Sequence, residues 1–80
     1  MKNNKKSNPE QSLLRLGYRK LHSDAEALIF QKGDIEIHFY HHRLAWTTFE
    51  RYHGNTLPVI TTAETQKAVN AMLDYLGYLE

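Results

Sequence analysis

The sequence contains no cysteine among its 80 residues, and this absence excludes several classes of protein. There can be no disulfide framework, no thiolate nucleophile and no zinc site of the cysteine type. No apolar run approaches the roughly 18 residues that a membrane-spanning helix needs, and residues 1–11 lack the apolar stretch of a signal peptide. We therefore expect a cytoplasmic protein that is neither exported nor anchored in a membrane.

A strong charge of one sign is also lacking. Ten Lys and Arg residues against nine Asp and Glu residues give a formal net charge of +1, so no overall field attracts nucleic acid. Lys2, Lys5 and Lys6 are concentrated near the start of the chain. We expect residues 1–7 to form a flexible basic leader and residues 8–80 a single domain, because a chain of this length builds only one small core.

What the sequence does contain is a repeated tripeptide, Leu16-Gly17-Tyr18 and Leu76-Gly77-Tyr78. Each copy follows an apolar stretch of helical spacing, and a glycine in the left-handed conformation commonly ends a helix. We expect both glycines to end helices, with each tyrosine packed back on its helix. The first helix should begin at Asn8-Pro9, and the second at the capping box Thr61-Thr62-Ala63-Glu64, with Thr61 as the cap.

Between these helices the pattern changes to that of strands. Residues 27–31 and 35–40 flank Gly33-Asp34, which suits a two-residue hairpin turn. This register places Phe30 opposite Ile37 and Leu28 opposite Phe39 on one face.

A third strand from Leu44 to about Arg51 follows through residues 40–43. It should place Leu44 beside Phe39 and add Trp46 and Thr48 to the same face. The expected fold class is therefore α+β with two layers: a short N-terminal helix, a three-stranded antiparallel meander and a C-terminal helix packed on one sheet face. Residues 18–21 form a possible fourth short strand.

The second face of this sheet stays exposed and carries the residues that we expect to bind a partner. Exposed aromatic residues and arginine are enriched in protein interfaces. With the loop that follows the strand, the expected binding residues are Glu36, His38, Tyr40, His41, His42, Arg43, Thr47, Phe49 and Arg51. The pattern favours a small non-enzymatic protein-binding module.

No pattern in the sequence indicates catalysis, a metal or a cofactor. Glu36, His38 and Tyr40 share one side of a strand, but neighbours in this trio lie roughly 7 Å apart along it, which is too far for a direct relay. The five histidines show no standard spacing for zinc ligands. A nucleophile elbow and a glycine-rich phosphate loop are both lacking. We expect no enzyme activity, no cofactor and no metal site.

Two alternative functions use the same surface. Nucleic acid could bind the exposed face with the help of Lys2, Lys5, Lys6, Arg43 and Arg51, although Glu36 and Glu50 beside that face count against it. Self-association through the face or an open strand edge would give a homodimer in place of a monomer.

The order of these features resembles that of small uncharacterised proteins of phages and prophages of Gram-positive bacteria. The resemblance rests on the two Leu-Gly-Tyr motifs and on the strand pair Ile29-Phe30-Gln31-Lys32 and Ile35-Glu36-Ile37-His38-Phe39. It implies a protein of a mobile element that binds or inhibits a bacterial host protein, such as a defence nuclease, in the manner of anti-CRISPR proteins. No functional residue is carried over by it.

Overall fold

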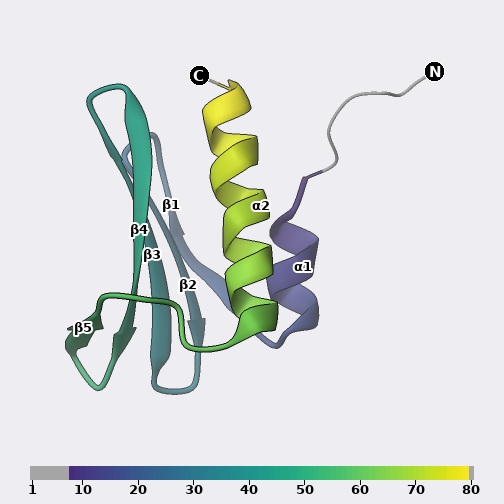
Figure 1. The fold of residues 1–80 in the computed structure, drawn as a ribbon, viewed down its shortest axis with the longest axis vertical. Helices are drawn as coiled ribbons and strands as arrows, with labels where there is room; N and C mark the ends of the chain where they lie inside the picture. The colour runs from purple at the N-terminus through teal and green to yellow at the C-terminus, as the bar shows by residue number, and fades with distance from the viewer. Residues whose placement is uncertain (1–7, 80) are drawn as a thin grey trace.

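The computed structural model describes residues 8–79, and the side chains of residues 8–77. Lys2, Lys5 and Lys6 lie outside the described residues, so the flexible leader stays a prediction. The elements are α1 (Glu10–Arg15), β1 (Arg19–Ser23), β2 (Ala27–Lys32), β3 (Ile35–His42), β4 (Ala45–Tyr52), β5 (Asn55–Leu57) and α2 (Ala63–Leu79) (Figure 1). No helix in this part of the chain is long and apolar enough to cross a membrane.

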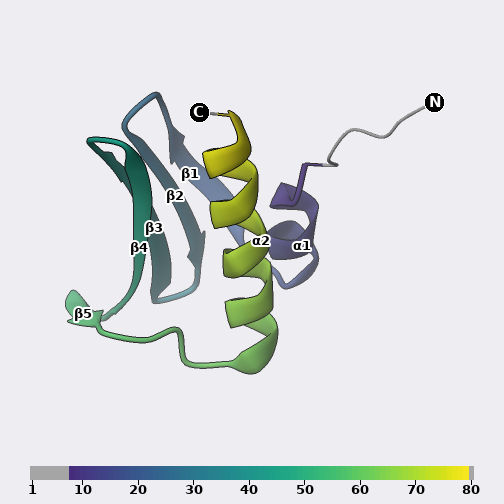
Figure 2. The same ribbon diagram turned by 45° about the horizontal axis from the view of Figure 1, so that its top comes forward.

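The five strands form one antiparallel sheet in the order β1-β2-β3-β4-β5. Both helices lie on one side of it, and the second face is left uncovered by any described helix (Figure 2). The α+β class and the C-terminal helix on the sheet are confirmed. The expected count of three strands is too low, because β1 is the possible fourth strand and β5 is a fifth strand that the sequence pattern did not predict.

The predicted register of the central hairpin is confirmed. Phe30 lies opposite Ile37 and Leu28 opposite Phe39, with a two-residue turn at Gly33-Asp34. Gly33 has a φ of +60°. A positive φ at the first central position of such a turn favours glycine, because a residue with a Cβ is strained there.

The predicted register between β3 and β4 is wrong. Thr48, not Leu44, lies opposite Phe39, and the turn is at Arg43-Leu44. The shorter turn adds the pairs His41–Trp46 and His42–Ala45 to the ladder and so satisfies more backbone groups. Because the displacement is an even number of residues, Trp46 and Thr48 keep their predicted face. Leu44 is instead at the hairpin apex, 94% exposed.

The two Leu-Gly-Tyr copies have different structures. At Gly17, where φ is +100°, α1 ends in a Schellman motif: the Tyr18 N–H donates to the Leu13 carbonyl and the Gly17 N–H to the Leu14 carbonyl. The second expected stop is wrong, because α2 continues through Gly77 to Leu79. One glycine costs a helix only about 1 kcal/mol, which the packing of α2 on the sheet offsets. The side chain of Tyr78 lies outside the description.

The starts of the two helices differ from the prediction by one residue. Asn8 accepts from the Glu10 N–H at 2.9 Å, as expected, but α1 begins at Glu10 and its N-cap position is Pro9, which has no side-chain cap bond. The predicted cap of α2 is wrong by one residue: Thr62, not Thr61, accepts from the Thr65 N–H at 3.2 Å. Thr61 instead precedes the cap and binds β4, where its N–H and hydroxyl both donate to the carboxylate of Glu50, at 2.8 and 3.0 Å.

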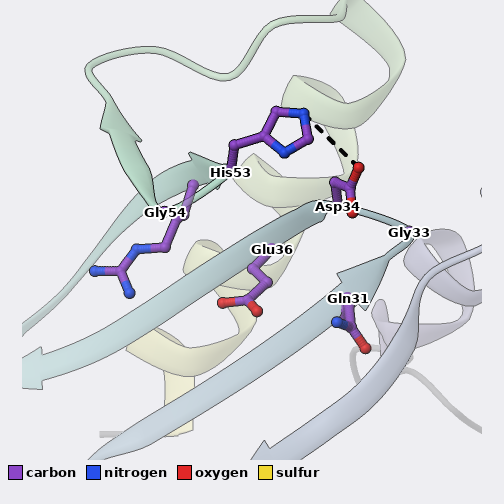
Figure 3. A pocket seen from close by; sticks show the side chains of 7 residues that line it. Gln31, Gly33, Asp34, Glu36, His53 and Gly54 are labelled. Carbon is purple, nitrogen blue, oxygen red and sulfur yellow. Dashed lines mark ion pairs between the residues drawn. The ribbon is translucent and has the colours of Figure 1, made fainter.

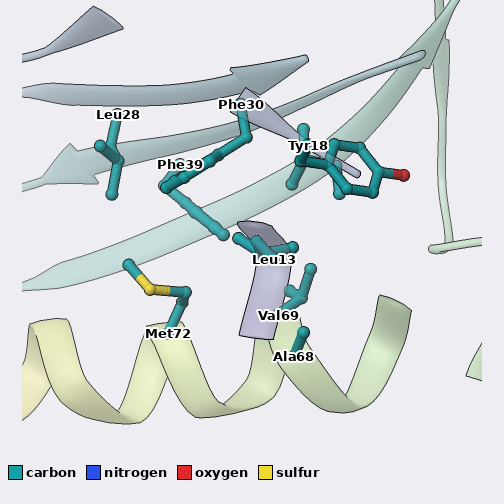
Figure 4. Packing of buried hydrophobic residues seen from close by; sticks show 9 residues of the cluster. Leu13, Tyr18, Leu28, Phe30, Phe39, Ala68, Val69 and Met72 are labelled. Carbon is teal, nitrogen blue, oxygen red and sulfur yellow. The ribbon is translucent and has the colours of Figure 1, made fainter. Parts of the chain in front are cut away.

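The core lies between the sheet and the helices. Side chains of β2 and β3 point toward α2, and those of α2 point back (Figure 4). The buried apolar residues are Leu13, Tyr18, Leu28, Phe30, Ile37, Phe39, Ala68, Val69 and Met72. This packing leaves the alternate residues of β3 and β4 on the opposite face, which we call the outer face.

Candidate functional site

Three polar side chains of β3 form a hydrogen-bonded chain on the outer face. Nε2 of His38 lies 2.8 Å from Oε1 of Glu36, and Nδ1 of His38 lies 3.0 Å from the hydroxyl of Tyr40. The expectation that these groups are too far apart for a relay is therefore wrong. The spacing of strand residues separates their Cα atoms, but long side chains that lean along the strand bring their polar ends together.

The ring of His38 also packs between aromatic neighbours. It lies stacked on Phe49 with ring centroids 5.0 Å apart and an interplanar angle of 19°. Tyr40 lies 5.7 Å from Phe49 at an angle of 18°. The guanidinium carbon of Arg51 lies 5.8 Å from the Phe49 ring centroid. We call Glu36, His38, Tyr40, Phe49 and Arg51 the outer-face cluster.

Strand pairing explains why these residues meet. The β3–β4 register places His38 opposite Phe49 and Glu36 opposite Arg51. The hydroxyl of Thr48 donates to the His38 carbonyl at 2.8 Å and holds the two strands at this point. As a result His38 is only 5% exposed, although no described helix covers this face, whereas Tyr40 is 37% exposed. Tyr40 is thus the tip of a chain whose middle member is buried.

The remaining predicted binding residues do not all join this cluster. Thr47 lies opposite Tyr40 and donates its hydroxyl to the Tyr40 carbonyl at 3.4 Å. His41 alternates onto the helix side, where its ring centroid is 5.1 Å from that of Trp46. His42 and Arg43 are at the exposed end of the hairpin, and Arg43 has a φ of +59°. The predicted set therefore divides between the outer face, the hairpin end and the helix side.

A polar pocket of about 300 Å³ adjoins the outer-face cluster at Glu36. It lies between the β2–β3 turn and the β4–β5 turn, where His53 reaches to 3.7 Å from Asp34 (Figure 3). Its lining residues are Gln31, Gly33, Asp34, Glu36, Arg51, His53 and Gly54. The sequence does not predict this pocket, because β5 was not expected as a strand. The sequence feature that could have indicated the pocket is the presence of two turns, at Gly33-Asp34 and at His53-Gly54, at the same end of the meander.

Glu50 belongs to the opposite side of the sheet from the outer-face cluster. It is 2% exposed and its carboxylate is held by Thr61. The expectation that Glu50 adds negative charge beside the binding face is therefore wrong. Burial raises the pKa of Tyr18, and the negative charge of Glu50 raises it further, while a hydrogen bond with Thr65 opposes the shift. The bonds between Glu50 and Thr61 stabilise the connection between the sheet and α2.

At the far end of the sheet, the turn between β1 and β2 contains a second ordered carboxylate. The N–H groups of Glu26 and Ala27 both donate to Asp24 at 2.8 Å. These bonds, and a smaller contribution from His22, lower the pKa of Asp24. Because the principal partners of Asp24 are backbone groups of its own turn, the role of this carboxylate is to stabilise the turn.

The outer-face cluster holds the hydroxyl of Tyr40 in a fixed position, where it can form a hydrogen bond with a bound group. A carboxylate beside an imidazole fixes the orientation of the ring, and the second ring nitrogen then fixes the hydroxyl that it contacts. Within the described part of the chain, no group of three His, Asp or Glu residues is placed to hold a metal ion. Comparison of the chain with models of protein families, with curated proteins and with solved structures finds no match.

Proposed function

We propose that this protein is a non-enzymatic binding module that contacts another protein through the outer face, with Tyr40 and Phe49 at the centre of the contact. The observation that supports this function is the ordered cluster of Glu36, His38, Tyr40, Phe49 and Arg51 on a sheet face that no described helix covers. Tyrosine and arginine dominate the binding energy of many protein interfaces.

The order within the cluster favours binding. An interface loses affinity when its side chains must be immobilised on association, at roughly 0.5–1.5 kcal/mol for each flexible side chain. Tyr40 is already held by His38, and Phe49 is already packed between His38 and Arg51. Much of the entropy cost of fixing these side chains therefore arises during folding and not on binding, so a partner contacts a surface that is already ordered.

The geometry supports a protein partner more strongly than single-stranded nucleic acid. Bases bind sheets by stacking on the free faces of aromatic rings. Here the rings of His38 and Phe49 are stacked on each other, and the Glu36 carboxylate is part of the same cluster. Nucleic-acid binding and self-association are the alternatives, and each predicts a different result in the experiment below.

The biological partner that we propose is a bacterial host protein in the cytoplasm, such as a defence nuclease. This part of the proposal rests on the resemblance to small phage and prophage proteins. The partner surface should be able to receive a tyrosine and a phenylalanine side by side, with an acidic group near Arg51.

Affinity capture from a host lysate with matched variants tests the proposed function. Tyr40→Ala and Phe49→Ala should each reduce capture of the partner about tenfold or more, as expected for interface anchors. Tyr52→Ala is the control, because Tyr52 is 44% exposed and alternates onto the other face of β4. Equal capture by all folded variants would contradict the proposal. Nuclease-sensitive capture would favour nucleic acid, and a dimer that Tyr40→Ala dissociates would favour self-association.

A further inference from the structure

The hydrogen-bonded chain on β3 has a direction. A neutral imidazole carries one N–H group and one acceptor nitrogen, whereas an ionised carboxylate only accepts. Nε2 of His38 faces the carboxylate of Glu36 at 2.8 Å, so Nε2 must carry the hydrogen. Nδ1 is then an acceptor, and the Tyr40 hydroxyl, 3.0 Å away, must donate to it. When His38 is neutral, Tyr40 therefore donates to His38, and His38 donates to Glu36.

This direction determines what Tyr40 offers at the surface. Its only hydrogen points inward to His38, and the lone pairs of its oxygen are left for other groups. On the basis of the proposed function, we infer that Tyr40 is presented to the partner as a hydrogen-bond acceptor and that the partner places a lysine or arginine side chain over it. The negative charge of Glu36 at the end of the chain complements such a cation.

Protonation of His38 reverses the direction of the hydrogen bond between His38 and Tyr40. Both ring nitrogens of an imidazolium are donors, so Nδ1 donates to the Tyr40 oxygen and the Tyr40 hydrogen turns outward. The face then presents a donor in place of an acceptor and no longer suits a cationic side chain. Binding through Tyr40 is therefore coupled to the protonation of His38.

The other groups around His38 define the electrostatic setting of this switch. On β3 the titratable neighbours are Glu36, Tyr40 and, at the strand end, His42. On β4 the outer face contributes the uncharged Phe49 and Thr47 and the cation Arg51. Ile29 on β2 lies opposite His38, and Gln31 lies opposite Glu36. Both helices lie on the other side of the sheet.

The first test measures the direction of the chain without a partner. Nitrogen-15 NMR of the full chain distinguishes a protonated from an unprotonated imidazole nitrogen. The expected result for neutral His38 is a protonated Nε2 and an unprotonated Nδ1. A neutral His38 with the hydrogen on Nδ1 would overturn the inference, because Tyr40 would then have to accept from His38.

The second test uses a displayed library of random peptides as the probe. Peptides are selected on the full protein and eluted by competition with unlabelled wild-type protein. The expected binders are enriched in lysine and arginine, and Tyr40→Phe weakens them by about two- to tenfold, the value of one hydrogen bond. Selected peptides that bind Tyr40→Phe as tightly as the wild type would overturn the inference.

The pH dependence of binding supplies the matched control. Affinity for the selected peptides should fall on acidification only in step with the protonation of His38 that NMR records in the same samples. His38→Gln should abolish this dependence, and His42→Gln should retain it. The same pH dependence in His38→Gln would overturn the coupling.

The two proposals fail in different ways. If selected peptides lose affinity for Phe49→Ala but not for Tyr40→Phe, the outer face binds protein and only the acceptor role is wrong. If neither Phe49→Ala nor Tyr40→Ala affects any selected peptide, the proposed function is contradicted together with the inference.

Discussion

The two faces of β3 and β4 are made by alternate residues of the same strands, yet they differ in what they bury and why. On the helix side, Ile37 and Phe39 are fully buried beneath α2, and Glu50 is closed off with Thr61 as its partner. On the outer face, His38 is nearly as buried, but its cover is made by Phe49 and its polar contacts by Glu36 and Tyr40.

This difference separates the energetic roles of the faces. The helix side removes apolar area from water, which is the main source of stability in so small a chain. The outer face arranges polar and aromatic groups with respect to one another at little gain in apolar burial.

The largest expected effect compares two phenylalanines on opposite faces. Phe39→Ala should lower the free energy of unfolding by about 3–5 kcal/mol, because it empties a fully buried site. Phe49→Ala should cost about 1–2 kcal/mol, since Phe49 is half-buried and loses mainly its ring contacts. Urea unfolding followed by circular dichroism measures both. Equal losses would mean that the outer face contributes as much to the core as the helix side.

A second comparison uses the two carboxylates. Glu50→Ala removes the acceptor for the N–H and the hydroxyl of Thr61 and should cost about 1–3 kcal/mol. Glu36→Ala removes one partner of the buried His38 ring, but Glu36 is itself 30% exposed, so water can take its place and the cost should be about 1 kcal/mol or less. The same unfolding assay ranks the two variants. A larger loss for Glu36→Ala than for Glu50→Ala would contradict the structural role of Glu50 on the helix side of the sheet.

The smallest effect at neutral pH concerns Tyr18. Tyr18 is buried and its pKa is raised above the ordinary value of 10.0, so the folded protein favours its neutral form. Its contribution to stability is fully present below that value and is lost as pH rises toward the raised pKa. Melting temperatures recorded on increasingly alkaline samples should therefore decrease more steeply for the wild type than for Tyr18→Phe.

The parts of the fold that the sequence predicts are those determined by local chemistry. Gly33-Asp34 defines a turn and, with it, the pairing of Phe30 with Ile37. Gly17 ends α1 because the chain there requires a positive φ. Arg43-Leu44 has no residue that favours a turn, so the β3–β4 register depends on the added strand pairs and could not be predicted from turn residues.

The same distinction applies to helix ends and to the candidate site. Gly77 occurs in the same tripeptide as Gly17 but stays helical, because packing along α2 outweighs the preference of one residue. Thr61 is diverted from its predicted capping role by Glu50, which is distant in sequence. The face of the cluster follows from strand alternation, whereas contact among Glu36, His38 and Tyr40 depends on side-chain orientation that spacing alone does not specify.

The central claim is that the outer face is the binding surface, and a footprint of the captured partner tests it most directly. Chemical-shift mapping of the labelled protein on addition of the partner reports which face is contacted. We predict the largest changes at Tyr40, Thr47, Phe49 and Arg51, with small changes at Tyr52 and along α1 and α2. Changes concentrated on the helices, with the outer face unaffected, would contradict the claim.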